Sequence, residues 1–130
     1  MKYLLFILTI VSLQTYSQTQ KIKIKKETNQ NLENGRKLFR QHCYQCHSET
    51  DQKLVAPPLI GVTKRLDIKW LISWVRCQED LIKSGDKYAN EIYDKWGKAG
   101  QPDYKFLTDQ EIKDIFTFTD TFVPTSKKKK

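Results

Sequence analysis

Apolar residues in much of this chain recur every three or four positions, which is the spacing of one face of an α-helix. Leu32, Leu38 and Phe39 follow this spacing. They predict a helix over residues 31–41, and Gly35 within it would let a neighbouring helix approach closely. The first element that we expect in the domain is therefore an amphipathic helix.

Residues 48–64 contain prolines and a glycine, and we expect them to be mostly loop. A second helical pattern begins after this loop. Asp67 can cap this second helix with its carboxylate. Its apolar positions share one side, with two tryptophans beside them: Ile68, Leu71, Ile72 and Val75, plus Trp70 and Trp74. Gly85 breaks this helix, and a third amphipathic piece runs from Asp86 to Gly97.

The clearest helix signal stands near the C-terminus. Thr108 and Glu111 form the capping box typical of a helix start. Ile112, Ile115 and Phe116 then continue a helical stripe. Because no alternating run typical of a strand occurs anywhere, the pattern predicts an all-α domain of about four helices with long loops. A domain this small buries little apolar surface, so it usually needs a cross-link or a cofactor to pack around.

The N-terminal segment combines one lysine, Lys2, with an apolar run from Tyr3 to Leu13. A run this short is typical of the core of a secretory signal and not of a bilayer-spanning helix. We expect cleavage after Ser17; an uncleaved anchor is the alternative, and either one exports the domain to the periplasm. The predicted organisation is a signal peptide, a basic polar linker, a helical domain and a Lys-rich tail, over residues 1–17, 18–30, 31–122 and 123–130.

The chain of 130 residues carries 23 Lys and Arg against 15 Asp and Glu, a formal net charge of +8. The lysines gather in two runs, residues 21–26 and 127–130. A basic surface can bind nucleic acid, anionic lipid or an acidic protein. Export argues against nucleic acid, which leaves the acidic docking surface of a partner protein or peripheral contact with an anionic membrane. Each Lys-rich end taken alone is also consistent with a solvated tail.

The candidate chemistry lies in residues 42–47, His-Cys-Tyr-Gln-Cys-His. A structural zinc site needs four ligands, usually in two separated pairs, and this chain has no second pair. A thioredoxin-type dithiol needs a parallel sheet, and no strand is predicted. The Cys-x-x-Cys-His spacing is the signature of c-type haem attachment. Two thiols one helical turn apart, Cys43 and Cys46, can each bond a porphyrin vinyl group, and His47 then lies beneath the iron.

With its surroundings, this motif resembles the small class I cytochromes c over most of residues 31–120. The segments that carry the resemblance are GRKLFRQHCYQCH, APPLIGVTKR and FLTDQEIKDIFTF. The resemblance implies a small all-α fold around one covalent haem c. It places Gly35 and Phe39 where the first helix crosses the last, and Phe118 at the family's usual aromatic position. It also implies an electron-transfer protein, in which no side chain performs acid–base catalysis.

The resemblance implies roles for residues outside the motif as well. The Pro57 carbonyl would accept a hydrogen bond from the His47 Nδ1–H and so fix the ring. Leu59 would pack near the haem, while Arg65 and Trp70 would reach its propionates. Pro57 as a simple turn residue and Arg65 as a solvated charge are the alternative interpretations.

The chain departs from the family at the sixth iron ligand. The family has a Met-Pro pair before the last helix, whereas here Gln101 precedes Pro102 and the only methionine is Met1. We expect Gln101, or water beside it, at the sixth position, and the loss of a thioether ligand should lower the haem potential. The other candidate sixth ligands are Lys98, Lys105, His42 and Cys77.

Two functions are consistent with this sequence. The first is an exported carrier that passes single electrons between respiratory-chain partners and is not an enzyme. The second is a haem protein whose open or labile sixth site binds nitric oxide, carbon monoxide or peroxide, as a sensor or scavenger. The Gln101 substitution supports the second function, but a low-potential carrier tolerates the same ligand.

Overall fold

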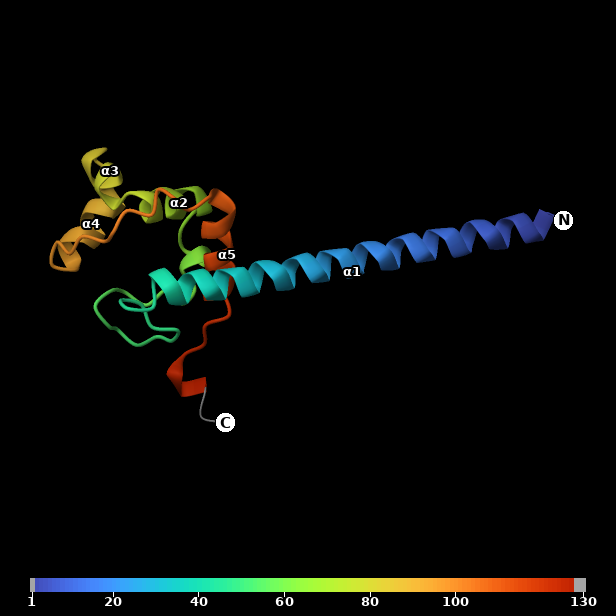
Figure 1. The fold of residues 1–130 in the computed structure, drawn as a ribbon, viewed down its shortest axis with the longest axis horizontal. Helices are drawn as coiled ribbons and strands as arrows, with labels where there is room; N and C mark the ends of the chain where they lie inside the picture. The colour runs from blue at the N-terminus through green and yellow to red at the C-terminus, as the bar shows by residue number, and fades with distance from the viewer. Residues whose placement is uncertain (1, 128–130) are drawn as a thin grey trace. The chain divides into compact units, whose positions relative to one another are not determined.

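The fold is built from helices joined by long loops (Figure 1). The computed structural model describes the backbone of residues 2–127 and the side chains of residues 18–126. The helices are α1 (Lys2–His42), α2 (Ile68–Arg76), α3 (Gln78–Lys83), α4 (Lys87–Lys95) and α5 (Asp109–Thr119), with 3-10 turns η1 (Val62–Lys64) and η2 (Thr125–Lys127). Residues 2–127 contain no strand, and the predicted all-α class is confirmed.

The chain divides into two compact units, residues 1–31 and 32–130, and α1 contributes to both. Residues 18–30, which we predicted as a basic polar linker, are helical and exposed. This stretch has no glycine or proline to interrupt a helix, and it is rich in the good helix formers Lys and Gln. The side chains of the predicted signal segment and the last lysines of the tail lie outside the described residues. None of the helices in the described part of the chain is long and apolar enough to cross a membrane.

In the unit of residues 32–130, the end of α1 crosses α5, as the resemblance implied (Figure 1). At the crossing, a Cβ on Gly35 would lie 1.8 Å from the Asp114 carbonyl oxygen, so only glycine lets the two backbones meet. One turn later, Phe39 is fully buried, with ring centroids 5.6 Å from Phe118 and 5.2 Å from Phe122. The remaining core members come from α2, α5 and the loops: Val62, Leu71, Ile72, Leu107, Ile112, Ile115 and Phe116, beside Leu38 of α1.

The helix starts follow the capping residues in the sequence. Asp67 accepts a hydrogen bond from the Lys69 backbone N–H at the start of α2, and Asp86 does the same for α4. The predicted capping box of α5 is confirmed, with Thr108 and Glu111 bonding each other's backbone N–H groups. These caps satisfy donors that have no partner within the helix.

The second predicted helix is two helices in the structure, which corrects the prediction. Cys77 ends α2 and begins α3 in an extended conformation, with φ −158° and ψ 96°. The break lets carbonyl groups at the end of α2 bond to the segment before α5. The Arg76 carbonyl accepts the Tyr104 N–H at 3.1 Å, and the Trp74 carbonyl accepts the Gln101 side-chain amide at 2.7 Å.

Candidate cofactor site

The Cys-x-x-Cys-His motif forms a turn that continues directly from the end of α1. The Cys43 N–H donates to the Phe39 carbonyl at 2.8 Å, which prolongs the helical pattern by one step. The N–H groups of Cys46 and His47 then donate to the Cys43 carbonyl at 3.1 and 2.9 Å. Both thiols are free; Cys43 is half-buried and Cys46 is exposed. The turn therefore offers two unpaired thiols and an imidazole within five positions.

Burial, with a smaller contribution from the neighbouring Cys46, raises the pKa of the Cys43 thiol to about 12. A thiol with so high a pKa stays protonated at neutral pH. Because the thiolate is the form that exchanges disulfides, Cys43 is poorly suited to that chemistry. The donor set fits a group that is attached by carbon–sulfur bonds and needs one imidazole nitrogen from the protein.

The His47 ring is fixed by a single backbone contact. Its Nδ1 lies 2.7 Å from the Pro57 carbonyl oxygen, the contact that the resemblance implied. Because a carbonyl only accepts, Nδ1 carries the hydrogen and Nε2 keeps its lone pair. Burial lowers the pKa of His47, although the Pro57 contact opposes this shift. The imidazole is therefore neutral at neutral pH and can bind a metal through Nε2.

Leu59 and Arg65, two further predicted site residues, lie in the loop that follows Pro57. Leu59 is half-buried and packs against the core. The exposed Arg65 guanidinium donates to the carbonyls of Gly61 at 3.3 Å and Ile60 at 3.4 Å. The structure thus places Leu59 at the edge of the core, and the expected roles of Leu59 near the haem and of Arg65 at a propionate stay predictions.

Trp70 stands in an aromatic cluster on α2 and α4. Its ring stacks on Trp74, with centroids 5.3 Å apart, and meets the Tyr88 ring edge-on at 5.2 Å. Its indole N–H donates to the Asp86 carboxylate at 3.1 Å. A hydrogen bond from Trp70 to a haem propionate would have to replace this bond to Asp86, because the indole has a single N–H. The expected role of Trp70 at a propionate also stays a prediction.

Gln101 is half-buried and held at both its backbone and its side chain. Its backbone N–H donates to the Gln78 side-chain oxygen at 2.9 Å, and its Nε2 donates to the Trp74 carbonyl at 2.7 Å. Within the described residues, the Gln101 carboxamide oxygen has no hydrogen-bond partner. This oxygen is therefore available as an acceptor or a metal ligand.

The other residues considered for a sixth ligand have partners of their own. Lys105 Nζ lies 3.2 Å from Asp103 and 3.7 Å from Asp80, and Lys98 Nζ lies 3.9 Å from Asp94. The His42 ring, half-buried at the end of α1, contacts two aromatic rings from the segment before α5. These contacts do not exclude the side chains as ligands, but each would have to be given up.

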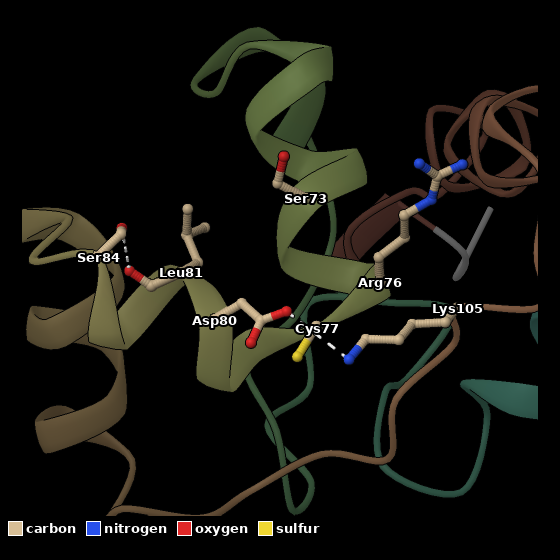
Figure 2. A pocket seen from close by; sticks show the side chains of 7 residues that line it. All are labelled: Ser73, Arg76, Cys77, Asp80, Leu81, Ser84 and Lys105. Atoms are coloured by element: carbon tan, nitrogen blue, oxygen red, sulfur yellow. Dashed lines mark hydrogen bonds and ion pairs between the residues drawn. The ribbon is translucent and has the colours of Figure 1, made fainter.

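Cys77, the remaining candidate, lines an open cavity of about 370 Å³ between α2 and α3 that contains none of the motif residues. Figure 2 shows Lys105 reaching toward the Asp80 carboxylate beside the Cys77 sulfur. A hydrogen bond from the Asp80 backbone lowers the pKa of this thiol, but burial and the Asp80 and Asp103 side chains raise it more, so the net shift is upward. Cys77, only 5% exposed, is a protonated core thiol.

Two residues near these groups, Tyr104 and Gln78, were not predicted from the sequence. The Tyr104 hydroxyl donates to the His42 carbonyl at 2.8 Å. Because His42 directly precedes Cys43, this hydrogen bond places the phenol beside the motif, and burial raises the pKa of Tyr104. The position of Tyr104, an aromatic residue two places after Pro102, could have indicated that it lies near the site. Gln78 carried no comparable signal, because its partners are backbone groups distant in sequence.

Comparison with known proteins places this geometry in a family. The family model described as cytochrome c matches residues 32–121. A search of curated proteins finds no match.

Solved structures resemble the fold. A cytochrome c from Rhodothermus marinus is 19% identical with a TM-score of 0.60, covering 70% of this chain and 75% of its own. An engineered form of that protein is 20% identical with a TM-score of 0.61, covering 70% and 76%. A cytochrome c domain from Pseudomonas putida is 23% identical with a TM-score of 0.56, covering 66% and 84%. At these identities the likeness shows the fold alone.

Proposed function

This chain belongs to the cytochrome c family, whose domain carries one covalently attached haem c with iron and transfers electrons, and we propose that it is an exported monohaem carrier. It would pass single electrons between respiratory-chain partners. In this proposal Cys43 and Cys46 form the two thioether bonds and Nε2 of His47 is the proximal iron ligand.

The observation that carries the proposal is the geometry of the turn at residues 43–47. Two free thiols one turn apart precede an imidazole whose Nδ1–H is held by the Pro57 carbonyl at 2.7 Å. This contact sets the tautomer, orients the ring and increases the basicity of Nε2. The half-buried position of Cys43 and His47 also keeps water away from one face of the site.

When bound, the haem supplies a one-electron couple between ferric and ferrous iron, and the protein supplies ligands, orientation and a low dielectric. We assign Gln101 to the sixth position, through its oxygen or through water beside it. The support is its place directly before Pro102 and its unused carboxamide oxygen. A hard oxygen ligand stabilises ferric iron relative to a thioether and gives a low potential.

The test is the absorption and electron-spin-resonance spectrum of the purified holoprotein, ferric and ferrous, with and without carbon monoxide. A ferrous haem whose spectrum changes little when the gas is added would support the plain carrier and would contradict Gln101 or water as the sixth ligand, because carbon monoxide readily displaces a weak oxygen ligand from ferrous iron. A high-spin ferrous haem that converts fully under carbon monoxide would support an oxygen ligand at the sixth position and a site that binds small ligands, as a sensor or scavenger. In that case the carrier is tested by its rate of electron transfer to a redox partner.

The net charge of +8 supports a redox partner with an acidic docking surface. The exposed lysines of residues 21–26 belong to this positive charge. Electron transfer to such a partner should slow steeply as salt rises, because screening removes the steering field. A rate independent of salt would exclude this docking mode, and binding to anionic but not neutral vesicles would show peripheral membrane contact instead. The proposed export is tested by finding the haem protein in the periplasmic fraction.

A further inference from the structure

One side chain, Gln78, holds the backbone of the segment that ends in Gln101. Gln78 is the first residue of α3 and is only 6% exposed. Its Oε1 accepts the Gln101 backbone N–H at 2.9 Å, and its Nε2 donates to the Ala99 carbonyl at 3.4 Å. Burying an amide is costly unless both its ends are bonded, so this side chain and residues 99–101 constrain each other.

The bonding partners dictate which way both carboxamides point. A backbone N–H only donates and a backbone carbonyl only accepts. Gln78 must therefore turn its oxygen toward the Gln101 N–H and its nitrogen toward Ala99. By the same rule, the Trp74 carbonyl takes an N–H of the Gln101 side chain at 2.7 Å. The Gln101 oxygen is the group that remains.

We propose that Gln78 is a positioning residue that, together with the Trp74 carbonyl, presents the oxygen and not the nitrogen of Gln101 to the sixth position of the iron. This inference rests on the proposed function, because it takes Gln101 as the residue at that position. A carboxamide nitrogen has no lone pair to offer, whereas the oxygen is a neutral, hard donor. The orientation therefore decides whether Gln101 can serve there at all.

Backbone features lie on either side of this contact. Lys98, just before residues 99–101, has φ 59°, the left-handed conformation, and no other non-glycine residue in the described part of the chain has a positive φ. Its N–H donates to the Tyr93 carbonyl at 2.9 Å, a bond at the end of α4 that helps to hold this turn. On the other side, α3 starts at Gln78 after the extended Cys77, and the Trp74 carbonyl accepts an N–H of the Gln101 side chain at 2.7 Å. The segment that Gln78 holds is therefore bonded on both sides.

The test measures how tightly added imidazole binds the ferric holoprotein, followed by visible absorption. We expect Gln78→Leu to tighten imidazole binding about tenfold, because losing these hydrogen bonds loosens the competing Gln101 side chain. Gln78→Glu keeps the acceptor for the Gln101 N–H but loses the donor to Ala99, so its effect should be intermediate. Imidazole binding unchanged in both variants would overturn the proposal.

A double-mutant cycle separates positioning from a general structural role. In a Gln101→Leu background, Gln78→Leu should cause no further change in imidazole affinity, because the positioned side chain is gone. An equal effect in both backgrounds would overturn the proposal. The matched control is Asn34→Leu, which removes a half-buried amide bonded to Asp114 at 2.7 Å and touches none of residues 99–101. Its imidazole affinity should equal that of the unchanged protein.

The sixth-position assignment of Gln101 and the positioning role of Gln78 can be disproved separately. If Gln101→Leu alone leaves the ferric spectrum and imidazole affinity unchanged, the sixth-position assignment is wrong and the inference falls with it. If Gln101→Leu changes them and Gln78→Leu does not, only the positioning role is wrong. Hydrogen exchange gives a readout independent of the spectrum. The Gln101 N–H should lose protection in Gln78→Leu and keep it in Gln78→Glu, and full protection in Gln78→Leu would contradict the inference.

Discussion

At residue 101 the proposed sixth ligand is a carboxamide oxygen, whereas the resemblance implies a methionine sulfur at that position. The backbone at this position is held by Gln78, and the carboxamide nitrogen by Trp74. The first of these contacts does not depend on which side chain residue 101 carries. Residue 101 can therefore be exchanged while its backbone contact to Gln78 is kept.

Replacing Gln101 by methionine should raise the midpoint potential by about 100 mV, since axial ligands span roughly 0.8 V across haem proteins. The reason is that a thioether stabilises ferrous iron better than an oxygen does. Spectroelectrochemistry measures the potential, and the near-infrared spectrum of the ferric protein reports sulfur ligation. Gln110→Met, on the exposed face of α5, is the control and should leave the potential unchanged. An unchanged potential in the 101 variant would show that this residue is not near the iron.

Gly35 is the second residue whose identity decides the structure. Gly35→Ala should destabilise the holoprotein by about 3 kcal/mol, because overpacking of a tight contact costs this much and both partners here are backbone. The added Cβ would lie 1.8 Å from the Asp114 carbonyl oxygen. Chemical denaturation measures the free energy of unfolding. The matched control is Gly100→Ala, where no atom lies within 4 Å, and its stability should be unchanged or slightly higher. Equal stability of both variants would show that the two helices do not meet at Gly35.

Among the elements, α5 depends on its N-terminal cap. The Thr108 hydroxyl accepts the Glu111 N–H at 3.2 Å, and the Glu111 carboxylate accepts the Thr108 N–H at 2.8 Å. Thr108→Ala should cost about 1 kcal/mol in the free energy of unfolding at pH 7, as for other N-cap deletions. Thr117→Ala, on the same helix but away from the cap, should cost less. A cost at residue 117 as large as that at residue 108 would contradict the assigned cap.

The same capping box makes a prediction about pH. Hydrogen bonds from the backbone and the side chain of Thr108 lower the pKa of Glu111 below its ordinary value of 4.5. Because the folded-state pKa is the lower one, this contribution to stability is complete above pH 4.5 and is lost as pH falls through the lowered pKa. The melting temperature of Glu111→Gln should therefore lie below that of the unchanged protein at pH 7, and the gap should shrink on acidification. Glu91→Gln, on the exposed face of α4, should show a small difference at either pH. A gap for the Glu111 variant that stays constant with pH would refute the assignment.

At the scale of the whole molecule, the haem is expected to complete the core. In a variant that carries both Cys43→Ser and Cys46→Ser, acid acetone should extract the haem, whereas the haem of the unchanged protein should stay with the polypeptide. The reason is that thioether bonds survive denaturation and axial coordination does not. Haem staining after denaturing electrophoresis makes the same comparison. Cys77→Ser, which changes the buried thiol outside the motif, is the control and should retain its haem. Retention in the double variant would show that these cysteines are not the points of attachment.

Much of this organisation could be predicted from local sequence signals. Residues close together in the sequence predict several local features, because short-range geometry dominates there. These features are the capping box of α5, the helix starts at Asp67 and Asp86, and the Cys-x-x-Cys-His turn. The helical conformation of residues 18–30 was not predicted, because these residues have no apolar face with helical spacing. Only the intrinsic helix propensity of their side chains favours a helix there.

The features that could not be predicted depend on contacts between distant segments. The sequence of residues 68–83 reads as one helix, and its interruption at Cys77 is accompanied by bonds from the Trp74 and Arg76 carbonyls to residues beyond position 100. The sequence alone determined the helical class, the Cys-x-x-Cys-His motif and the absence of any methionine other than Met1, because each depends on residue identity and short spacing. Only the tertiary structure decided where the helix breaks and which atom of Gln101 is left unbonded. Every residue has a backbone carbonyl, so residue identity does not show which carbonyl accepts a given hydrogen bond, and the sequence does not predict the partner.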